Sequence, residues 1–195
     1  MMRGRTVNLR YALNEDIETI IPMTMDEEIC RLLYGSKLRS KNEQKAFIKN
    51  LIDRQSDNFP YTIFLLIETK AGKPIGFVNL HSIDWKNGNI INDMAITDRP
   101  HRGRGAAVET VALMTSFVFN ELNMRKFIGN IYDFNGNSLS LYKRMSVFGL
   151  VQEGTLRSHS FKSGGYHDVQ VFSILKEDYE KYASTLNKLA GIGEK

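Results

Sequence analysis

The most informative part of this sequence is the stretch Ile96-Thr97-Asp98-Arg99-Pro100-His101-Arg102-Gly103-Arg104-Gly105-Ala106-Ala107. An apolar run typical of a β-strand leads into it, and an apolar pattern with helical periodicity follows it. The first N–H groups of a helix have no intrahelical acceptors and lie at the positive end of the helix dipole. Small residues in front of the helix let an anion approach these groups closely. The stretch therefore predicts a phosphate-binding turn between a strand and a helix.

Charge and spacing narrow the kind of phosphate site. Arg102 and Arg104 add positive charge to the predicted turn. The Gly-Lys-Ser/Thr of a Walker A loop is absent, and the spacing differs from the G-x-G-x-x-G of a Rossmann dinucleotide site. The turn therefore belongs to another class of phosphate-binding protein.

Upstream of the turn, the apolar pattern predicts one strand, two helices and then three antiparallel strands. The pair Asn87-Gly88 predicts a chain reversal before the last of these strands, because Asn-Gly tolerates positive φ. Helical spacing marks the helices, and β-rich runs mark the strands. The predicted elements are the strand Val7–Tyr11, helices from Ile17 to about Met25 and from Asn42 to Arg54, and the strands Tyr61–Ile67, Ile75–Ile83 and Ile90–Ile96.

Downstream of the turn, helices and strands alternate, which predicts a central β-α-β unit in an α+β protein. The predicted elements are the helix Val108–Leu122, the strand Lys126–Tyr132, the helix Ser138–Phe148, the strands Leu150–Phe161 and Tyr166–Leu175, and a helical tail from about Glu177. The chain has no internal repeat or low-complexity linker. We therefore expect a single domain over residues 1–195.

A second motif, Asn135-Gly136-Asn137-Ser138-Leu139-Ser140-Leu141-Tyr142, resembles the N-x-x-S/A-x-x-L/I-Y element of the GNAT N-acetyltransferases. The segment Arg102–Ala107 resembles the R/Q-x-x-G-x-G/A signature of the same family. The resemblance spans about Val7 to Tyr179, although only these two motifs are specific. It implies a three-layer α+β fold, in which helices flank a mixed, mostly antiparallel sheet of about seven strands. The sheet is expected to splay beside its central strand, so that CoA enters the gap.

The resemblance also implies roles for particular residues. Acetyl-CoA would donate the acyl group without a metal, and Tyr142 would protonate the departing CoA thiolate. Backbone groups of the strand before the turn would pair with pantetheine and polarise the acetyl carbonyl. Asn135 would hydrogen-bond the pantetheine arm. The cofactor-binding residues implied in this way are Met94, Ala95, Ile96, Arg102, Gly103, Arg104, Gly105, Ala106, Ala107, Asn135 and Asn137.

Amine acetylation also needs a group that accepts the proton of the nucleophile. Asp93 lies near the position where many relatives carry an acidic residue, and it is our candidate, although an exposed Asp at a strand end fits the pattern equally. His81 on the preceding strand is a second candidate, with a structural role as its alternative. The family passes to a Gly-Phe pair after the Tyr142 helix, whereas the segment 145–150 is about two residues longer.

The acceptor amine is less patterned. The segment Phe161–Tyr179 resembles the closing hairpin of the branch with ribosomal-protein N-terminal and spermidine acetyltransferases, so a peptide or protein N-terminus is expected first. A polyamine is second, because the acidic trio Asp26-Glu27-Glu28 would meet a polycation. An aminosugar or another small amine is third. His167-Asp168 either faces the acceptor or is a solvated polar pair, and a non-catalytic CoA-binding sensor is the alternative of another class.

Composition bounds the partners and the compartment. The net charge is +4, but the basic residues are mostly scattered and the densest group lies in the glycine turn, which favours a small anion over a nucleic acid. The single cysteine, Cys30, cannot form an internal disulfide, and no Cys/His cluster has zinc-ligand spacing. No apolar run approaches 18 residues. We expect a cytoplasmic enzyme that binds neither membrane nor metal, with a homodimer as a possibility.

Overall fold

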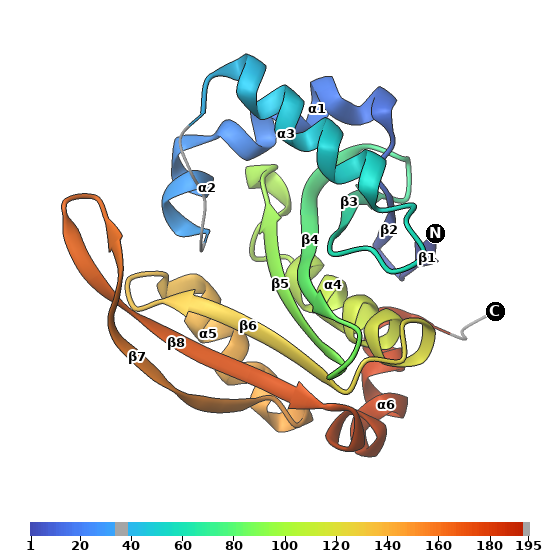
Figure 1. Cartoon of the computed structure of the whole chain (residues 1–195). Helices are drawn as coiled ribbons and strands as arrows, with labels where there is room; N and C mark the ends of the chain where they lie inside the picture. The colour runs from blue at the N-terminus through green and yellow to red at the C-terminus, as the bar shows by residue number, and fades with distance from the viewer. Residues whose placement is uncertain (34–38, 193–195) are drawn as a thin grey trace.

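The computed structural model describes residues 1–33 and 39–192 and is built on a continuous eight-stranded sheet in the order β1-β2-β3-β4-β5-β6-β8-β7 (Figure 1). Neighbouring strands are antiparallel except for the parallel pair β5 and β6. The strands are β1 (Met2–Arg3), β2 (Val7–Tyr11), β3 (Ile63–Thr69), β4 (Pro74–Asp84), β5 (Asn89–Ile96), β6 (Lys126–Tyr132), β7 (Val151–Lys162) and β8 (Gly165–Leu175). The α+β class is therefore confirmed.

One strand and one helix more than the sequence predicts are present. The added strand, β1, pairs two residues with β2, which is too short for an alternating pattern. The added helix, α2 (Glu27–Leu32), begins where the Asp26 carboxylate accepts a hydrogen bond from Ile29 N at 3.0 Å. Six residues do not complete two helical turns, so periodicity gives no signal for it.

Helices cover both faces of the sheet and form two outer layers (Figure 1). α1, α2 and α3 share a core with inward side chains of β3 and β4, including Phe64, Leu66 and Phe77. The opposite face of the sheet packs against α4, α5 and α6. The remaining helices are α1 (Ile17–Met25), α3 (Lys41–Arg54), α4 (Ala106–Ser116), α5 (Gly136–Met145) and α6 (Lys176–Ala190). The three-layer arrangement expected from the sequence is present.

Two predicted helix ends take unusual forms. The helix that begins after the glycine turn ends as α4 at Ser116 and continues as a π turn over Phe117–Glu121. After α5, a 3₁₀ turn over Ser146–Phe148 ends at Gly149, whose φ of +91° suits glycine.

The central feature for function is the divergence of β5 and β6. Their parallel pairing starts at Asn89 and ends where Asn92 lies opposite Gly129. Beyond this pair, β5 continues to Ile96 beside β4, while β6 turns away toward β8 (Figure 1). The predicted splay beside the central strand is confirmed.

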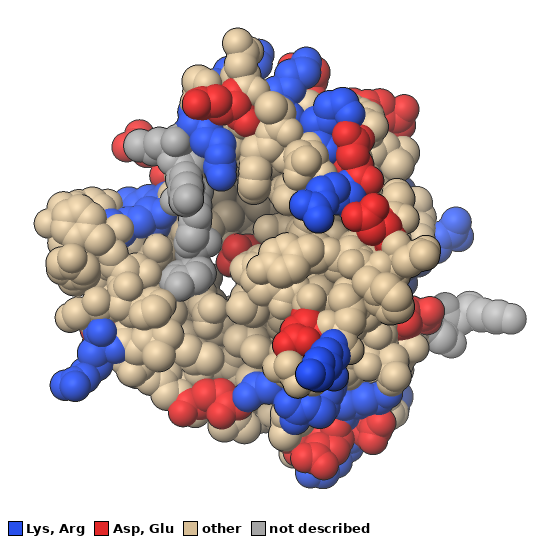
Figure 2. Space-filling view, in the orientation of Figure 1, with Lys and Arg blue, Asp and Glu red and all other residues tan. Residues whose placement is uncertain are grey.

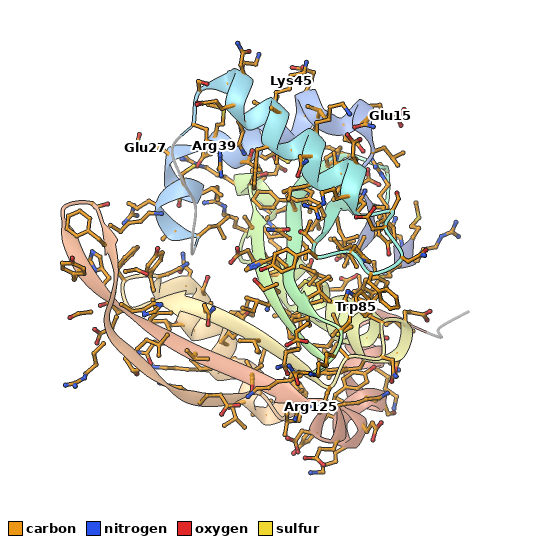
Figure 3. All side chains as sticks on the ribbon, in the orientation of Figure 1. Glu15, Glu27, Arg39, Lys45, Trp85 and Arg125 are labelled. Atoms are coloured by element: carbon orange, nitrogen blue, oxygen red, sulfur yellow. The ribbon has the colours of Figure 1, made fainter. Side chains whose placement is uncertain are left out.

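Charged side chains lie mostly around the edge of the face seen in Figure 2, which is hollowed near its centre. Glu15 and Lys45 point outward from the helices above the sheet (Figure 3). Trp85 and Arg125 lie toward the end of the β4–β5 hairpin, away from the splay (Figure 3). Among the described residues, no helix is long and apolar enough to cross a membrane.

Candidate active site

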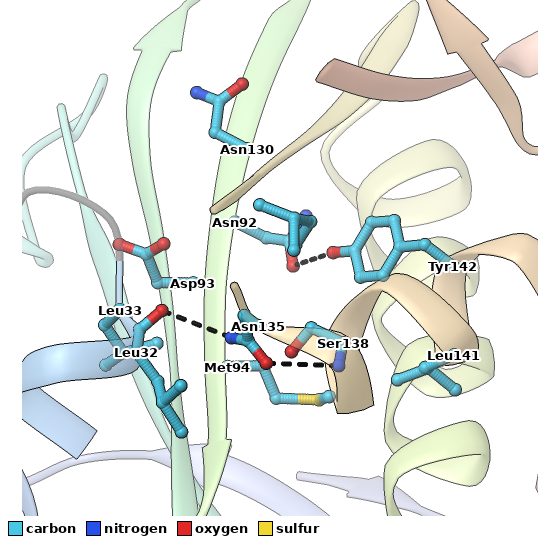
Figure 4. A pocket seen from close by; sticks show the side chains of 11 residues that line it. Leu32, Leu33, Asn92, Asp93, Met94, Asn130, Asn135, Ser138, Leu141 and Tyr142 are labelled. Carbon is cyan, nitrogen blue, oxygen red and sulfur yellow. Dashed lines mark hydrogen bonds between the residues drawn. The ribbon is translucent and has the colours of Figure 1, made fainter. Parts of the chain in front are cut away.

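A pocket opens where β5 and β6 diverge (Figure 4). Its walls come from the splayed part of β5, the facing part of β6, the start of α5 and the end of α2. Predicted site residues from the strand before the glycine turn, Asp93 and Met94, and from the Asn135–Tyr142 motif therefore meet here, although about 40 residues separate them in the chain. The lining residues are Leu32, Leu33, Asn92, Asp93, Met94, Asn130, Ile131, Asn135, Ser138, Leu141 and Tyr142.

Tyr142 projects from α5 into this pocket and is 6 % exposed. Its hydroxyl donates a hydrogen bond to Asn92 Oδ1 at 3.0 Å (Figure 4). Burial raises the pKa of the Tyr142 phenol to about 12, and the negative charge of Asp93 acts in the same direction. The phenol is therefore protonated at neutral pH, which is the state an acid needs.

Asp93, the predicted base, follows Asn92 on β5 and lines the same pocket. Its Oδ2 lies 3.2 Å from His81 Nε2, although the angles do not make this contact a hydrogen bond. His81 Nδ1 lies 3.1 Å from Ser82 Oγ. The structure thus brings together the two residues that the sequence left as separate candidates. Both side chains are mostly buried, with exposures of 14 % for Asp93 and 22 % for His81.

The predicted phosphate turn lies between the end of β5 and the N-terminus of α4. A 3₁₀ turn over Arg99–His101 leads into Gly103 and Gly105, whose φ values are +74° and +90°. A Cβ at either glycine would meet no atom within 4 Å, so the turn is open to an anion. The eleven-residue helix α4 starts directly at Ala106 and presents its first N–H groups there. These features fit a pyrophosphate.

Arg102 has a partner that the sequence does not indicate. Its Nη1 donates to both carboxylate oxygens of Glu28 on α2, at 2.9 and 3.0 Å, and its Nε donates to Ile96 O at 2.8 Å. Arg104, in contrast, is exposed. Helix α2 is thus tied to the phosphate turn by an ion pair across 74 residues of sequence.

The other predicted cofactor residues fall into two groups. Met94, Ala95 and Ile96 pair with β4 on one side and face the gap left by β6 on the other, so their position fits the expected backbone role. Asn135 caps α5 by accepting from Ser138 N at 3.2 Å, and its Nδ2 donates to Leu32 O at 3.2 Å (Figure 4). Asn137 is exposed on α5 and is not among the pocket-lining residues.

Aromatic rings and cations lie beside the pocket, and sequence reasoning missed them. Tyr132 and Phe134 stack with ring centroids 4.9 Å apart. Lys162 Nζ lies 5.6 Å from the Tyr132 centroid and donates to Leu33 O at 3.5 Å, while Arg31 Cζ lies 5.9 Å from the Phe134 centroid. We call these two cations and two rings the cationic rim. The sequence signal that could have indicated this cluster is the run Tyr132-Asp133-Phe134 at the end of β6.

His167 and the acidic trio also have definite positions. His167 lies within β8, not in the hairpin turn, and its ring packs edge-on against Phe134 at 4.6 Å. In the trio, Asp26 caps α2 and Glu28 binds Arg102. Two of the three acidic residues thus have partners within the chain, and the third, Glu27, is exposed.

The splayed sheet, the open glycine turn and the buried tyrosine are the features that the resemblance predicts for an acetyl-CoA-dependent acetyltransferase. In agreement, the sequence profile of the acetyltransferase (GNAT) domain matches residues 6–146. Because this match covers more than half of the chain, the protein belongs to the GNAT acetyltransferase family. It is an N-acetyltransferase, and acetyl-CoA is its acyl donor.

Individual relatives support the same class. The chain is 29 % identical over 178 residues to the SPbeta prophage-derived uncharacterized N-acetyltransferase YokL of Bacillus subtilis (strain 168). This alignment covers 91 % of this chain and 94 % of the relative. It is 25 % identical over 175 residues to the uncharacterized N-acetyltransferase p20 of Bacillus licheniformis, in an alignment that covers 89 % of this chain and 94 % of that relative.

A solved structure shares the fold. The spermidine N-acetyltransferase of Vibrio cholerae, solved in complex with CoA and spermine, superposes with a TM-score of 0.78 at 23 % identity, over 89 % of this chain and 98 % of that one. At this identity the likeness concerns the fold.

Proposed function

We propose that this enzyme transfers the acetyl group of acetyl-CoA directly to the amino terminus of a peptide or protein. The observation that carries the catalytic part is that Tyr142 and Asp93 line one pocket at the point where β5 and β6 part. One is a protonated phenol and the other a carboxylate beside a histidine. An acid and a proton acceptor on one pocket are the groups that amine acetylation requires.

The proposed acetyl transfer includes two proton transfers, one from the amine and one to the thiolate. The amine forms a bond to the acetyl carbon, and its proton passes to the Asp93–His81 pair, directly or through a water. As the carbon–sulfur bond breaks, the Tyr142 hydroxyl gives its proton to the thiolate, and solvent restores it. The products are an amide and the free thiol.

In this proposal, backbone groups make the main contacts with acetyl-CoA. The N-terminus of α4 and the turn at Gly103 and Gly105 hold the pyrophosphate, and Met94–Ile96 offer main-chain groups to the pantetheine arm and the carbonyl oxygen. Arg102 and Arg104 supply positive charge. Acetyl-CoA supplies the activated acetyl group.

The choice of a peptide acceptor rests on charge. Of the described residues that line the pocket, Asp93 is the one carboxylate, which suits a single ammonium. The cationic rim adds Lys162 and Arg31 next to it, and Glu28 is engaged by Arg102. A chain of several ammonium groups would meet repulsion there, whereas peptide carbonyls and carboxylates would accept hydrogen bonds from the rim.

A polyamine is the second candidate, and the solved neighbours favour it. The Vibrio cholerae enzyme of similar fold is named a spermidine N-acetyltransferase and was solved with spermine. An acceptor comparison decides between the two. Thiol release is measured with acetyl-CoA and either a free-N-terminus peptide that has an acidic second residue, the same peptide with a blocked N-terminus, or spermidine.

Variants of the rim sharpen this comparison. With a peptide acceptor, Lys162→Glu and Arg31→Glu should each raise the KM of the peptide about 5- to 30-fold, the range for one charge contact of about 1–2 kcal/mol. The polyamine proposal expects the reverse, a lower KM for spermidine in the same variants. Release with spermidine alone would overturn the peptide acceptor.

The catalytic roles have their own test. Tyr142→Phe should lower kcat about 10²- to 10³-fold, the range for general acid catalysis, while acetyl-CoA binding measured by calorimetry stays within about twofold. Asp93→Asn should also lower kcat, with partial recovery at alkaline pH, where more of the amine is already neutral. A non-catalytic sensor would bind acetyl-CoA but release no thiol with any acceptor.

We further propose a cytoplasmic homodimer that needs neither metal nor nucleic acid. Among residues 1–33 and 39–192, no cluster of three or more His, Cys, Asp or Glu has metal-binding geometry. Sedimentation of the free protein tests the dimer, and thiol release in the presence of EDTA tests the metal requirement. Steeply salt-dependent DNA binding would contradict the last expectation.

A further inference from the structure

Asn92 holds the proposed acid in one orientation. Its side chain is 3 % exposed and lies between β6 and α5. Asn92 Nδ2 donates to Ile128 O at 2.7 Å, and Asn92 Oδ1 accepts from the Tyr142 hydroxyl at 3.0 Å. Because the first bond requires the amide nitrogen to face β6, the oxygen must face the tyrosine.

This arrangement sets the direction of the hydrogen bond. An amide oxygen only accepts, so the Tyr142 oxygen must carry the proton in this contact. Asn92 therefore fixes the orientation of the Tyr142 hydroxyl and of the ring that carries it.

Gly129 makes room for the same ring. It lies directly opposite Asn92 in the last pair of the β5–β6 ladder. A Cβ at this glycine would lie 2.4 Å from Tyr142 Cε1 and 2.6 Å from its hydroxyl oxygen, which is closer than non-bonded atoms approach. The final pair before the splay thus supplies both the hydrogen-bond acceptor and the space for Tyr142.

We propose that Asn92 and Gly129 are positioning residues, which together hold the Tyr142 ring and hydroxyl at the pocket where the thiol leaves. The hydroxyl turns from Asn92 to the thiolate when it gives up its proton. This inference rests on the proposed function, because it gives Tyr142 the role of the acid. The backbone of β5 and β6 sets the position, and α5 delivers the side chain. Neither residue belongs to the two motifs that mark the site in the sequence.

A double-mutant cycle tests the role of Asn92. Asn92→Leu should lower kcat about 10- to 100-fold with little change in the KM of acetyl-CoA, because an interaction that serves only the acid step is lost. In a Tyr142→Phe background, the same substitution should change kcat less than about twofold, since the group that it positions is already gone. A full additional loss in that background would mean a merely structural role and would overturn the proposal.

A glycine pair tests the steric part. Gly129→Ala should lower kcat about 10-fold or more through displacement of the Tyr142 ring, whereas Gly154→Ala, in the exposed strand β7, should leave kcat unchanged. A Cβ at Gly154 meets no atom within 4 Å, so it controls for the alanine itself. Equal kcat values in the two variants would overturn the role of Gly129.

An activity-independent measurement separates this proposal from the proposed function. A buried hydroxyl proton held by an acceptor exchanges slowly and gives its own ¹H NMR signal. The signal of Tyr142 should be absent in Tyr142→Phe and lost in Asn92→Leu. If it persists in Asn92→Leu, the positioning is refuted, whatever the activity. If it behaves as expected but no acceptor is acetylated, the proposed function alone fails.

Discussion

At the scale of single residues, burial decides what Tyr142 can do. The motif marks the position of this tyrosine in the sequence, and its helix could equally have placed the ring at the edge of a core. In the folded chain the ring packs against Phe172 with centroids 5.4 Å apart, and its hydroxyl meets Asn92. The apolar wall keeps the phenol neutral, and the single polar partner sets the direction in which its hydroxyl points.

The raised pKa of Tyr142 predicts a loss of stability at high pH. Above pH 10 the unfolded chain releases this phenol proton, while the folded chain keeps it until the pKa of about 12. The folded state then binds more protons, so the free energy of unfolding falls as pH rises through this window. Tyr142→Phe should show a shallower fall in urea titrations between pH 10 and 12. Identical slopes in the two proteins would count against a buried, neutral phenol.

At the scale of elements, Glu28 joins α2 to the phosphate turn, since its carboxylate pairs with Arg102 at 2.9 Å and with Arg99 at 3.7 Å. The Glu28 carboxylate holds Arg102, so a bound pyrophosphate must share or replace that partner. Glu28→Gln removes the competing negative charge, and we expect CoA to bind about 2- to 5-fold more tightly, as for an exposed pair worth about 0.5–1 kcal/mol.

Calorimetric titration with CoA at low salt measures this effect. Glu27→Gln is the matched control, because Glu27 is exposed on the same helix and makes no contact with Arg102. Weaker binding in Glu28→Gln would show instead that Glu28 holds Arg102 in the orientation that the pyrophosphate needs.

The glycine turn allows a comparison of strain with function. Gly105→Ala and Gly72→Ala both place a Cβ at positive φ, +90° and +79°, and neither Cβ meets an atom within 4 Å. Each should lower the free energy of unfolding by about 1 kcal/mol. Only Gly105→Ala should weaken CoA binding, by about 10-fold or more, because its methyl group occupies the approach of the phosphate. Equal CoA affinities would exclude this turn as the pyrophosphate site.

At the scale of the whole molecule, a buried carboxylate joins the start of the sheet to α4. Glu109 is 6 % exposed, and its Oε1 accepts from Thr6 N at 2.8 Å and from Val7 N at 3.1 Å. Glu109→Ala leaves these N–H groups without their acceptor, so stability should fall by on the order of 3 kcal/mol. Urea unfolding measures it, and Glu180→Ala on the exposed side of α6 is the control.

The layers also explain why the sequence gives little information about the acceptor amine. Helices α1–α3 cover β3–β5 but do not extend over β8 and β7 in Figure 1. The hollow in Figure 2 lies between these two parts. The residues of the cationic rim come from α2, from β6 and the loop that follows it, and from β7. Charged residues that are far apart in the chain and close together only in the folded structure follow no fixed spacing in the sequence.

What the sequence determined by itself was the fold class and the order of all elements except β1 and α2, and it supplied the proposals for the phosphate turn and for Tyr142 as the acid. These follow from local causes: apolar periodicity, the conformational freedom of glycine, and motifs within one strand–helix junction. The tertiary structure alone decided that Asp93 faces His81, that Glu28 holds Arg102, and that Asn92 and Gly129 position Tyr142. Each of these contacts depends on how strands and helices pack, and the chain separates the partners by 12 to 74 residues. Periodicity and motif spacing carry no information about such distances.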